Sequence, residues 1–443
     1  MHDGQGKVKT LLFFFSVSTT LLLAGCRGLV GGSSAGNIAA VNHVIFMLQE
    51  NRSFDTYFGQ LNAYRQSQGL TPEVDGMPAN ASNPADDGTM VAAFKLNTLC
   101  IENLSPAWLE SHGNFNRYNP AGPPLMDGFV HTAQGLAKFE GLHDTAGKRA
   151  MGYYDAGDLL YYYFMATAFA TSDRWFAPMP SNSPPNRIAA FAATTQGHAH
   201  EPLQELTAPT IFHRLSNAGI SWKIYYTDTL AGGAPADSLH NYWPTFAHAH
   251  SANIVPVSQY LTDVRNGTLP AVSFIEAGYF SGLDEHPGSG ENIQAGQQYV
   301  ASLINALMAS PSWKDSAFFL SYDEGGAAYD HVVPMNAVQP DGIAPRDLTS
   351  TDPPGNFTRT GFRVPLIVVS PYTRKGYVSH KPADYTAVLK FIETRWRLSP
   401  LTKRDAVQMD MTEFFDFHNP SWATPPNPPA ANVDTSRCYD GLP

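Results

Sequence analysis

Apolar runs alternate with amphipathic stretches along most of the chain. Short runs rich in β-branched and aromatic residues predict buried strands at residues 41–48, 220–226, 269–276, 317–322 and 364–370. Apolar residues at helical spacing predict helices at residues 158–171, 208–219, 292–310 and 384–397. Strands that alternate with helices predict an α/β fold, in which a mostly parallel central sheet is flanked by helices on both faces. Residues 60–125 are polar and rich in Asn, Pro and Gly, which indicates a long insertion after the first strand.

The first 25 residues have the pattern of an export signal. Lys7 and Lys9 precede an apolar run from Leu11 to Ala24, which is too short for a usual transmembrane helix. The run ends at Cys26 in a sequence that resembles the bacterial lipobox, in which this cysteine is lipidated. We therefore expect a lipoprotein signal peptide at 1–25 and a flexible tether at 26–40. An ordinary signal peptide, or a buried helix with a chance cysteine, is the alternative.

A lipidated Cys26 would place the protein outside the cytoplasm. It would be anchored through its lipid to a bacterial cell membrane, facing the periplasm or on the cell surface. In such an oxidising space, Cys100 and Cys438 are the remaining pair of the three cysteines. A disulfide between them would hold the Pro-rich C-terminal tail, residues 419–443, against the rest of the chain. The alternative is two unpaired buried thiols.

Composition narrows the choice of partner. The 443 residues are 43% hydrophobic, which excludes general disorder. Lys and Arg together number 28 against 39 Asp and Glu, giving a formal net charge of -11, and no Lys/Arg-rich run is present. Nucleic acid is therefore not an expected partner. An anionic substrate would need positive charge supplied locally at its binding site.

Acidic residues directly follow two of the expected strands. Glu50 and Asn51 come after the first strand, and Asp323 and Glu324 come after the strand at 317–322. Ligands of parallel sheets bind at the carboxyl ends of the strands, where a buried carboxylate is costly unless it is paired or bound to metal. Carboxylate and amide oxygens suit a divalent cation. Spacing alone leaves helix caps and salt bridges equally open.

Five motifs in order along the chain resemble those of the bacterial phosphoesterase family, which contains phospholipases C and acid phosphatases. They are Val44 to Gly59 (VIFMLQENRSFDTYFG), Ser183 to Arg187 (SPPNR), Asp284 to Pro287 (DEHP), Tyr322 to Gly326 (YDEGG) with Tyr329-Asp330-His331, and Arg363-Val364-Pro365. The resemblance covers roughly residues 41–417, so we expect one catalytic domain at 41–418. It implies an alkaline-phosphatase-like α/β fold.

The resemblance also implies roles for individual residues. Glu50, Asn51, Asp323 and Glu324 match positions that bind a divalent metal ion, whose identity the sequence does not indicate. Ser183 matches the nucleophile, and Asn186 and Arg187 are candidate contacts to the phosphoryl oxygens. His286, His331 and His112 are candidates for phosphate contact or for protonating the leaving group. Without the family, Ser183 would indicate only a turn in a Ser/Pro-rich loop, and each histidine would be a structural residue.

The expected function is metal-dependent hydrolysis of phosphoric esters through a serine nucleophile and a phospho-enzyme. The substrate would be a phospholipid, as for a phospholipase C, or a small phosphomonoester, as for an acid phosphatase. The sequence leaves both open. The alternative from another class is a non-catalytic, lipid-anchored protein that binds phosphorylated ligands.

Overall fold

The computed structural model describes residues 38–119, 122–288, 290–439 and 442. The predicted signal peptide and Cys26 lie outside these residues. Of the expected tether, only residues 38–40 are described, and they form a short 3-10 helix whose Ile38 is buried. Within the described residues, no helix is both long and apolar enough to span a bilayer.

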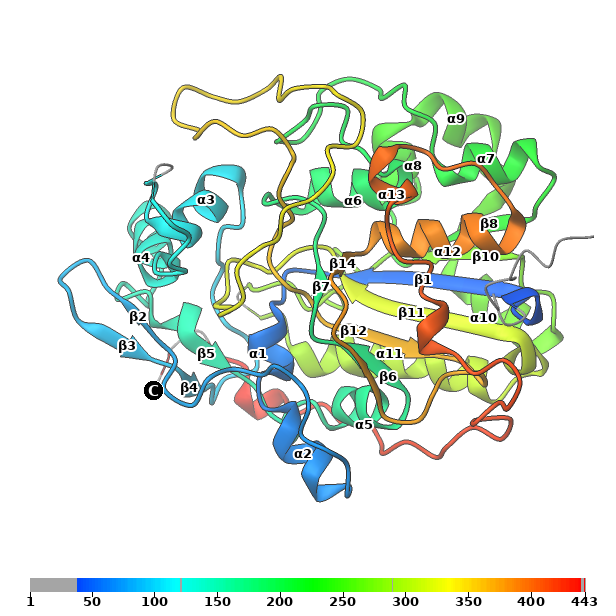
Figure 1. Ribbon diagram of the computed structural model, residues 1–443, viewed down its shortest axis with the longest axis horizontal. Coiled ribbons are helices and arrows are strands. Elements are labelled where there is room, and N and C mark those ends of the chain that lie inside the picture. The colour runs from blue at the N-terminus through cyan, green and yellow to red at the C-terminus, as the bar shows by residue number, and fades with distance from the viewer. Residues whose placement is uncertain (1–37, 120–121, 289, 440–441, 443) are drawn as a thin grey trace, which may run out of the picture. The chain divides into compact units, whose positions relative to one another are not determined.

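An eight-stranded sheet forms the centre of the domain (Figure 1). Its strands, in spatial order, are β13 (Tyr377–Ser379), β6 (Ala170–Ser172), β12 (Leu366–Val369), β11 (Ser316–Tyr322), β1 (His43–Gln49), β10 (Val272–Ile275), β8 (Trp222–Tyr226) and β9 (Ile254–Pro256). All pairs are parallel except those of β12 with β11 and with β6. The central strands β1 and β11 are buried almost throughout, as expected for strands covered on both faces. The predicted α/β fold class with a mostly parallel sheet is confirmed.

Two helical layers cover the sheet (Figure 1). One layer contains α6 (Ser183–Ala192), α7 (Ile211–Asn217), α8 (Ser238–Tyr242), α9 (Pro244–Ala249), α12 (Thr386–Trp396) and α13 (Lys403–Ala406). The other contains α5 (Leu160–Ala168), α10 (Val257–Asn266) and α11 (Ile293–Met308). The predicted helix at 158–171 is too long, because Ala170 pairs with Val368 and turns the segment into β6. Here strand pairing outweighs the helical spacing of the apolar residues.

The insertion after β1 is longer than the polar pattern predicts, because the chain does not return to the main sheet until β6. It contains α1 (Phe54–Phe58), α2 (Leu61–Ser67), α3 (Trp108–Asn116) and α4 (Phe129–Glu140). It also contains two small ladders, β2 (Ser82–Pro84) with β3 (Met90–Ala92), and β4 (Phe94–Lys95) with β5 (Gly152–Tyr153). A further ladder joins β7 (Trp175–Phe176) to β14 (Ala383–Asp384).

A disulfide joins Cys100 in the insertion to Cys438 in the C-terminal tail, with the Cα atoms 4.9 Å apart. Hydrogen bonds accompany it, since Leu99 N donates to Arg437 O at 2.7 Å and Arg437 pairs with the buried Asp158. The bridge therefore fixes the tail to the body of the domain.

We expect Cys438→Ser to lower the free energy of unfolding by about 2–4 kcal/mol, since the bridge restricts the unfolded chain. Thermal melts with and without reductant check this. The wild-type melting temperature should fall in reductant and that of the variant should not change. A wild-type protein whose melting is insensitive to complete reduction would contradict the expectation.

Glu393 is a buried acid on α12 with an incomplete set of partners. Its Oε1 accepts a hydrogen bond from Leu401 N at 3.2 Å, whereas Oε2 has no partner among the described residues. Burial and the neighbouring Asp405 raise the pKa of Glu393 to about 9. The fold therefore favours the protonated acid. The stability from this group is complete below the ordinary pKa near 4.5 and is lost as the pH rises through about 9.

The Glu393→Gln variant carries no such dependence, because an amide cannot ionise. We expect variant and wild type to have similar stability near pH 4.5. At pH 8 the variant should be more stable, by about 1–2 kcal/mol after allowance for solvent screening. Urea unfolding at both pH values measures the difference. A difference that is constant with pH would show that Glu393 does not titrate in this window.

Candidate active site

Three neighbouring parallel strands deliver acidic side chains to one edge of the sheet. Gln49 at the end of β1 pairs with Tyr322 at the end of β11, and Met47 pairs with Ile275 at the end of β10. The next residues in the chain are Glu50, Asp323 and Glu276, all less than 5% exposed. Glu276 was not among the predicted site residues, although it too follows an apolar strand directly. That shared signal could have identified it.

The turn after β1, at Asn51, packs closely against the turn after β11, at Gly326. This contact fixes the positions of the acidic residues that follow the two strands. Asn51 has the left-handed φ of 58°, which Asn tolerates better than most residues, and its N donates to Asp323 Oδ1 at 3.1 Å. Gly326 N donates to Glu324 Oε2 at 2.6 Å. A Cβ on Gly326, whose φ is 65°, would collide with the backbone oxygen of Asn51. Glycine is therefore required at position 326 for the two turns to meet.

Ser183 lies at the start of α6 and reaches this edge. Its Oγ donates to Glu50 Oε2 at 2.8 Å and lies 3.2 Å from Asn51 Oδ1. The following Pro184 and Pro185 occupy the first turn, where the absent backbone N–H costs no helical hydrogen bond. The prolines that suggest a loop in the sequence thus begin a helix, and the helix holds the hydroxyl among the acids.

Asn186 does not contact the site cavity, in contrast to the substrate contact predicted for it. Its side chain is fully buried, and its Oδ1 accepts from Met179 N at 2.9 Å. Its Nδ2 donates to Ser181 O at 2.7 Å. Both ends of the amide are occupied by backbone, so Asn186 positions the loop that precedes Ser183.

Arg187, one turn along α6, is the counter-ion of the acids. It pairs with Glu50 at 2.6 Å, with Glu276 at 3.3 Å and with Asp323 at 3.4 Å, and it is 4% exposed. Burial alone would raise the pKa of Glu50, but the charge of Arg187, together with hydrogen bonds from Asp323 and Ser183 and the nearby His286, lowers the pKa overall. Arg187 therefore offsets part of the negative charge at this edge of the sheet.

His286 joins the site through Asn51. Its Nδ1 lies 2.8 Å from the carbonyl oxygen of Pro287 and must donate to it, so Nε2 is the acceptor for the Asn51 amide at 3.0 Å. His286 and Ser183 both line a cavity of about 420 Å³, together with Arg187, Tyr242, Tyr279 and Asp284. Burial and the charges of Glu50 and Glu291 raise the pKa of Asp284 to about 9.

The four predicted metal ligands lie near one another and include two oxygens free for a cation, although Glu50, Asp323 and Glu324 do not bring ligand atoms within 4.8 Å of one another as Asp55, Asp330 and His331 do. Asp323 Oδ2 and Glu324 Oε1 are buried and have no hydrogen-bond partner among the described residues. Burial raises the pKa of both acids well above the ordinary value, and so do the negative charges of Glu50 on Asp323 and of Asp323 on Glu324. A single guanidinium does not neutralise this set. A divalent cation would satisfy the two free oxygens and offset the remaining charge.

His331 lies in a second acidic cluster. Its Nδ1 is 2.7 Å from Asp55 Oδ2, and single ligand atoms of Asp55, Asp330 and His331 lie within 4.8 Å of one another. That spacing is compatible with a metal ion. However, Arg363 already pairs with Asp55 and with Asp330, each at 2.9 Å. This internal cation makes the cluster a salt-bridge network, and the structure does not bring His331 into the lining of the Ser183 cavity.

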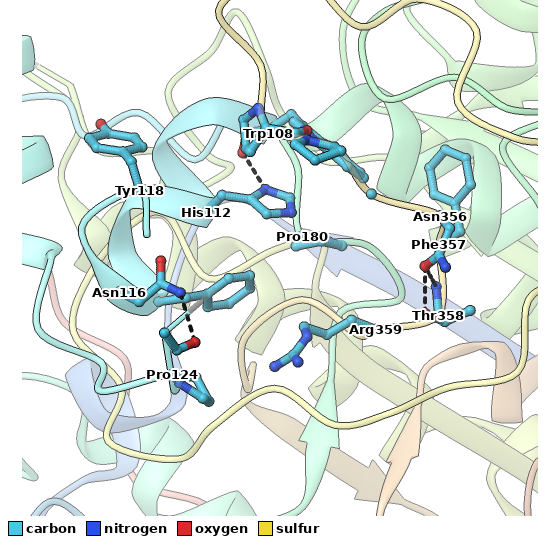
Figure 2. A pocket seen from close by; sticks show the side chains of 15 residues that line it. Trp108, His112, Asn116, Tyr118, Pro124, Pro180, Asn356, Phe357, Thr358 and Arg359 are labelled. Atoms are coloured by element: carbon cyan, nitrogen blue, oxygen red, sulfur yellow. Dashed lines mark hydrogen bonds between the residues drawn. The ribbon is translucent and has the colours of Figure 1, made fainter. Parts of the chain in front are cut away.

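His112 is also apart from Ser183. It lies on α3 and lines a different cavity, of about 260 Å³, between that helix and residues 353–359 (Figure 2). Its Nδ1 donates to Trp108 O at 2.7 Å. The structure therefore joins Glu50, Asn51, Ser183, Arg187, His286, Asp323 and Glu324 in one site, and leaves His112, His331 and Asn186 outside the cavity that Ser183 lines.

The fold and site define an α/β enzyme whose serine hydroxyl is held among buried carboxylate and amide side chains. A model of the Phosphoesterase family matches residues 41–399. The chain belongs to this family and is a hydrolase of phosphoric esters.

The chain is similar to phospholipases C over most of its length. Phospholipase C B of Mycobacterium tuberculosis is 28% identical over 451 residues, covering 92% of this chain and 82% of the relative. Non-specific phospholipase C1 of Arabidopsis thaliana is 28% identical over 401 residues, covering 85% and 71%. A solved alkaline phosphatase superfamily protein of Vibrio parahaemolyticus has a TM-score of 0.34 at 12% identity, covering 82% of this chain and 80% of that one. Similarity at this level is too low to assign a function.

Proposed function

We propose that the protein is a metal-dependent phospholipase C-like hydrolase that uses Ser183 as its nucleophile and passes through a phospho-enzyme. The observation that carries the proposal is the 2.8 Å hydrogen bond from Ser183 Oγ to Glu50, beside two buried carboxylate oxygens that have no hydrogen-bond partner among the described residues. The names of the relatives favour a phospholipid diester over a monoester as substrate.

Each residue of the site has a distinct role in the proposed reaction. A serine hydroxyl is a weak nucleophile at neutral pH, and Glu50 is placed to accept its proton as the oxygen attacks phosphorus. Arg187 lines the cavity and faces the charge that develops on the phosphoryl oxygens. His286 lines the same cavity and is the candidate to protonate the leaving alkoxide, for which it must be doubly protonated and its Nε2 must release the Asn51 amide. A divalent cation held by Glu50, Asn51, Asp323 and Glu324 would lower the pKa of the hydroxyl and neutralise phosphoryl charge.

The test is a comparison of initial hydrolysis rates for phosphatidylcholine, a simple phosphodiester and a phosphomonoester. Metal-replete protein is measured before chelation, after chelation and after metal is returned. The proposal predicts diester cleavage that is lost on chelation and restored by a divalent metal. Cleavage of the monoester alone would assign the protein to the acid phosphatase type. Cleavage that survives complete removal of metal would overturn the metal-dependent mechanism.

A further inference from the structure

The 260 Å³ cavity beside α3 is a built site that the hydrolytic mechanism does not use. Its lining includes Trp108, His112 and Asn116 from the helix, and Asn356, Thr358 and Arg359 from the segment before β12. Trp108 Nε1 donates to Pro353 O at 2.9 Å and so ties the segment to the helix. The cavity walls therefore come from two parts of the chain that are held in a fixed relation.

One wall of the cavity is aromatic. The rings of Trp108 and His112 have centroids 4.5 Å apart, and Phe357 contacts Trp108 edge to face at 5.7 Å. Phe115 packs against His112 at 5.4 Å. Trp108, Phe115 and Phe357 are each at most 5% exposed, so this wall is rigid and dry apart from the surface that it presents to the cavity.

Arg359 brings an uncompensated positive charge to the cavity, beside the aromatic wall. Its guanidinium lies 5.7 Å from the Phe115 ring centroid, and its one hydrogen bond within the described chain is a long one of 3.5 Å to Pro334 O. Within residues 38–119, 122–288 and 290–439, no carboxylate pairs with it. By contrast, the buried Arg187, Arg363 and Arg404 all have acidic partners. Arg359 thus keeps a planar set of donors free in a chain of net charge -11.

His112 adds a second polar group that faces the same space. Because Nδ1 donates to Trp108 O, Nε2 is the ring nitrogen left for a ligand. Figure 2 shows the side chains of His112 and Arg359 extending toward the middle of the cavity. Burial, together with the charge of Arg359, lowers the pKa of His112, although Asp352 acts in the opposite direction. Neither Asp352 nor any other described carboxylate is part of the cavity lining.

We propose that this cavity is a second, non-catalytic binding site for a small organic phosphate. The phosphate would accept hydrogen bonds from the guanidinium fork of Arg359, its singly protonated form would donate an O–H to Nε2 of His112, and the organic part would lie against the aromatic wall. A guanidinium matches two phosphate oxygens at once, whereas a lone apolar cavity would not select an anion. Pro180 also lines this cavity and precedes Ser183 by three residues, so the two sites are adjacent along one loop but separate.

The probe is phenylphosphonate, which carries the phosphate charge and a ring but cannot be hydrolysed at an ester bond. Equilibrium dialysis of metal-replete protein counts the molecules bound per chain. We expect two in the wild type, one at each site, and one in Arg359→Gln. The matched control is Arg346→Gln, which removes the same charge from an exposed residue of the same segment and should still bind two. Arg359→Gln that binds as many as the wild type would overturn the proposal.

Two further measurements cover the remaining outcomes. If Arg359→Gln does not give a native circular dichroism spectrum, Arg359→Lys keeps the charge without the fork and should weaken the second site roughly tenfold or more. Inorganic phosphate in place of phenylphosphonate tests the aromatic wall, and it should bind the second site more weakly. Equal affinities would overturn the assignment of the organic part to that wall and identify free phosphate as the ligand.

Discussion

Replacing Ser183 with alanine should reduce kcat by about 10⁴-fold or more while leaving the fold intact. The loss is large because the two-step reaction has no attacking group without the hydroxyl. The fold should survive because Ser183 lies in the first helical turn of α6 and its side chain bonds only to Glu50 and Asn51. Initial rates at saturating substrate, with a thermal melt of each protein, provide the measurement.

The matched variant is Ser183→Thr, which keeps a hydroxyl at the same position. A threonine hydroxyl can attack phosphorus as a serine hydroxyl can, so we expect this variant to retain measurable turnover. Turnover by Ser183→Ala close to that of the wild type would remove Ser183 from the mechanism. Equal loss in the Ala and Thr variants would show that packing at this position, rather than the hydroxyl, matters.

Replacing Asp323 with asparagine should weaken metal binding by at least about 100-fold and reduce activity in parallel. Oδ1 of Asp323 accepts hydrogen bonds from Asn51 N at 3.1 Å and from Glu324 N at 2.8 Å, and an amide oxygen can keep both. The buried Oδ2, which has no hydrogen-bond partner among the described residues, would become a donor and lose its charge. The change therefore alters the proposed metal-facing atom, and it also removes the 3.4 Å ion pair between that atom and Arg187.

Asp330→Asn is the control for that experiment, because Asp330 lies on the same loop in the acidic cluster that Arg363 already neutralises. We expect it to lower stability, since a buried ion pair loses one partner, and to leave the metal content unchanged. Metal content after dialysis, measured by elemental analysis, separates the two clusters. Loss of metal from Asp330→Asn but not from Asp323→Asn would transfer the metal to the Asp55 cluster.

The sequence predicts those residues of the site that directly follow a buried strand. Glu50 and Asp323 follow apolar runs, and parallel pairing of β1 with β11 brings them to one edge. The same reasoning applies to Glu276 after β10, which contacts Arg187 directly. Glu276 lies outside the five motifs, so the resemblance to the family does not identify it, whereas the strand pattern does.

The remaining parts depend on contacts that no local pattern specifies. Arg187 is at the site because α6 begins among the acids, although its two prolines suggest a loop. Asn186 lies next to it in the motif, yet faces the backbone of the preceding loop. His331 follows Asp330 in a motif that resembles one of the phosphoesterase family. However, His331 contacts Asp55, and Asp55 pairs with Arg363, so residues from distant segments fix its position. Side-chain direction decided these roles, and spacing along the chain does not report it.

The central claim is that hydrolysis proceeds in two steps through Ser183. The stereochemical course at phosphorus tests it most directly, with a phosphodiester substrate made chiral at phosphorus by sulfur and oxygen isotope substitution. Each in-line displacement inverts phosphorus, so attack by Ser183 followed by attack of water predicts net retention of configuration. Net inversion would mean that water attacks the substrate in a single step and would contradict a covalent role for Ser183.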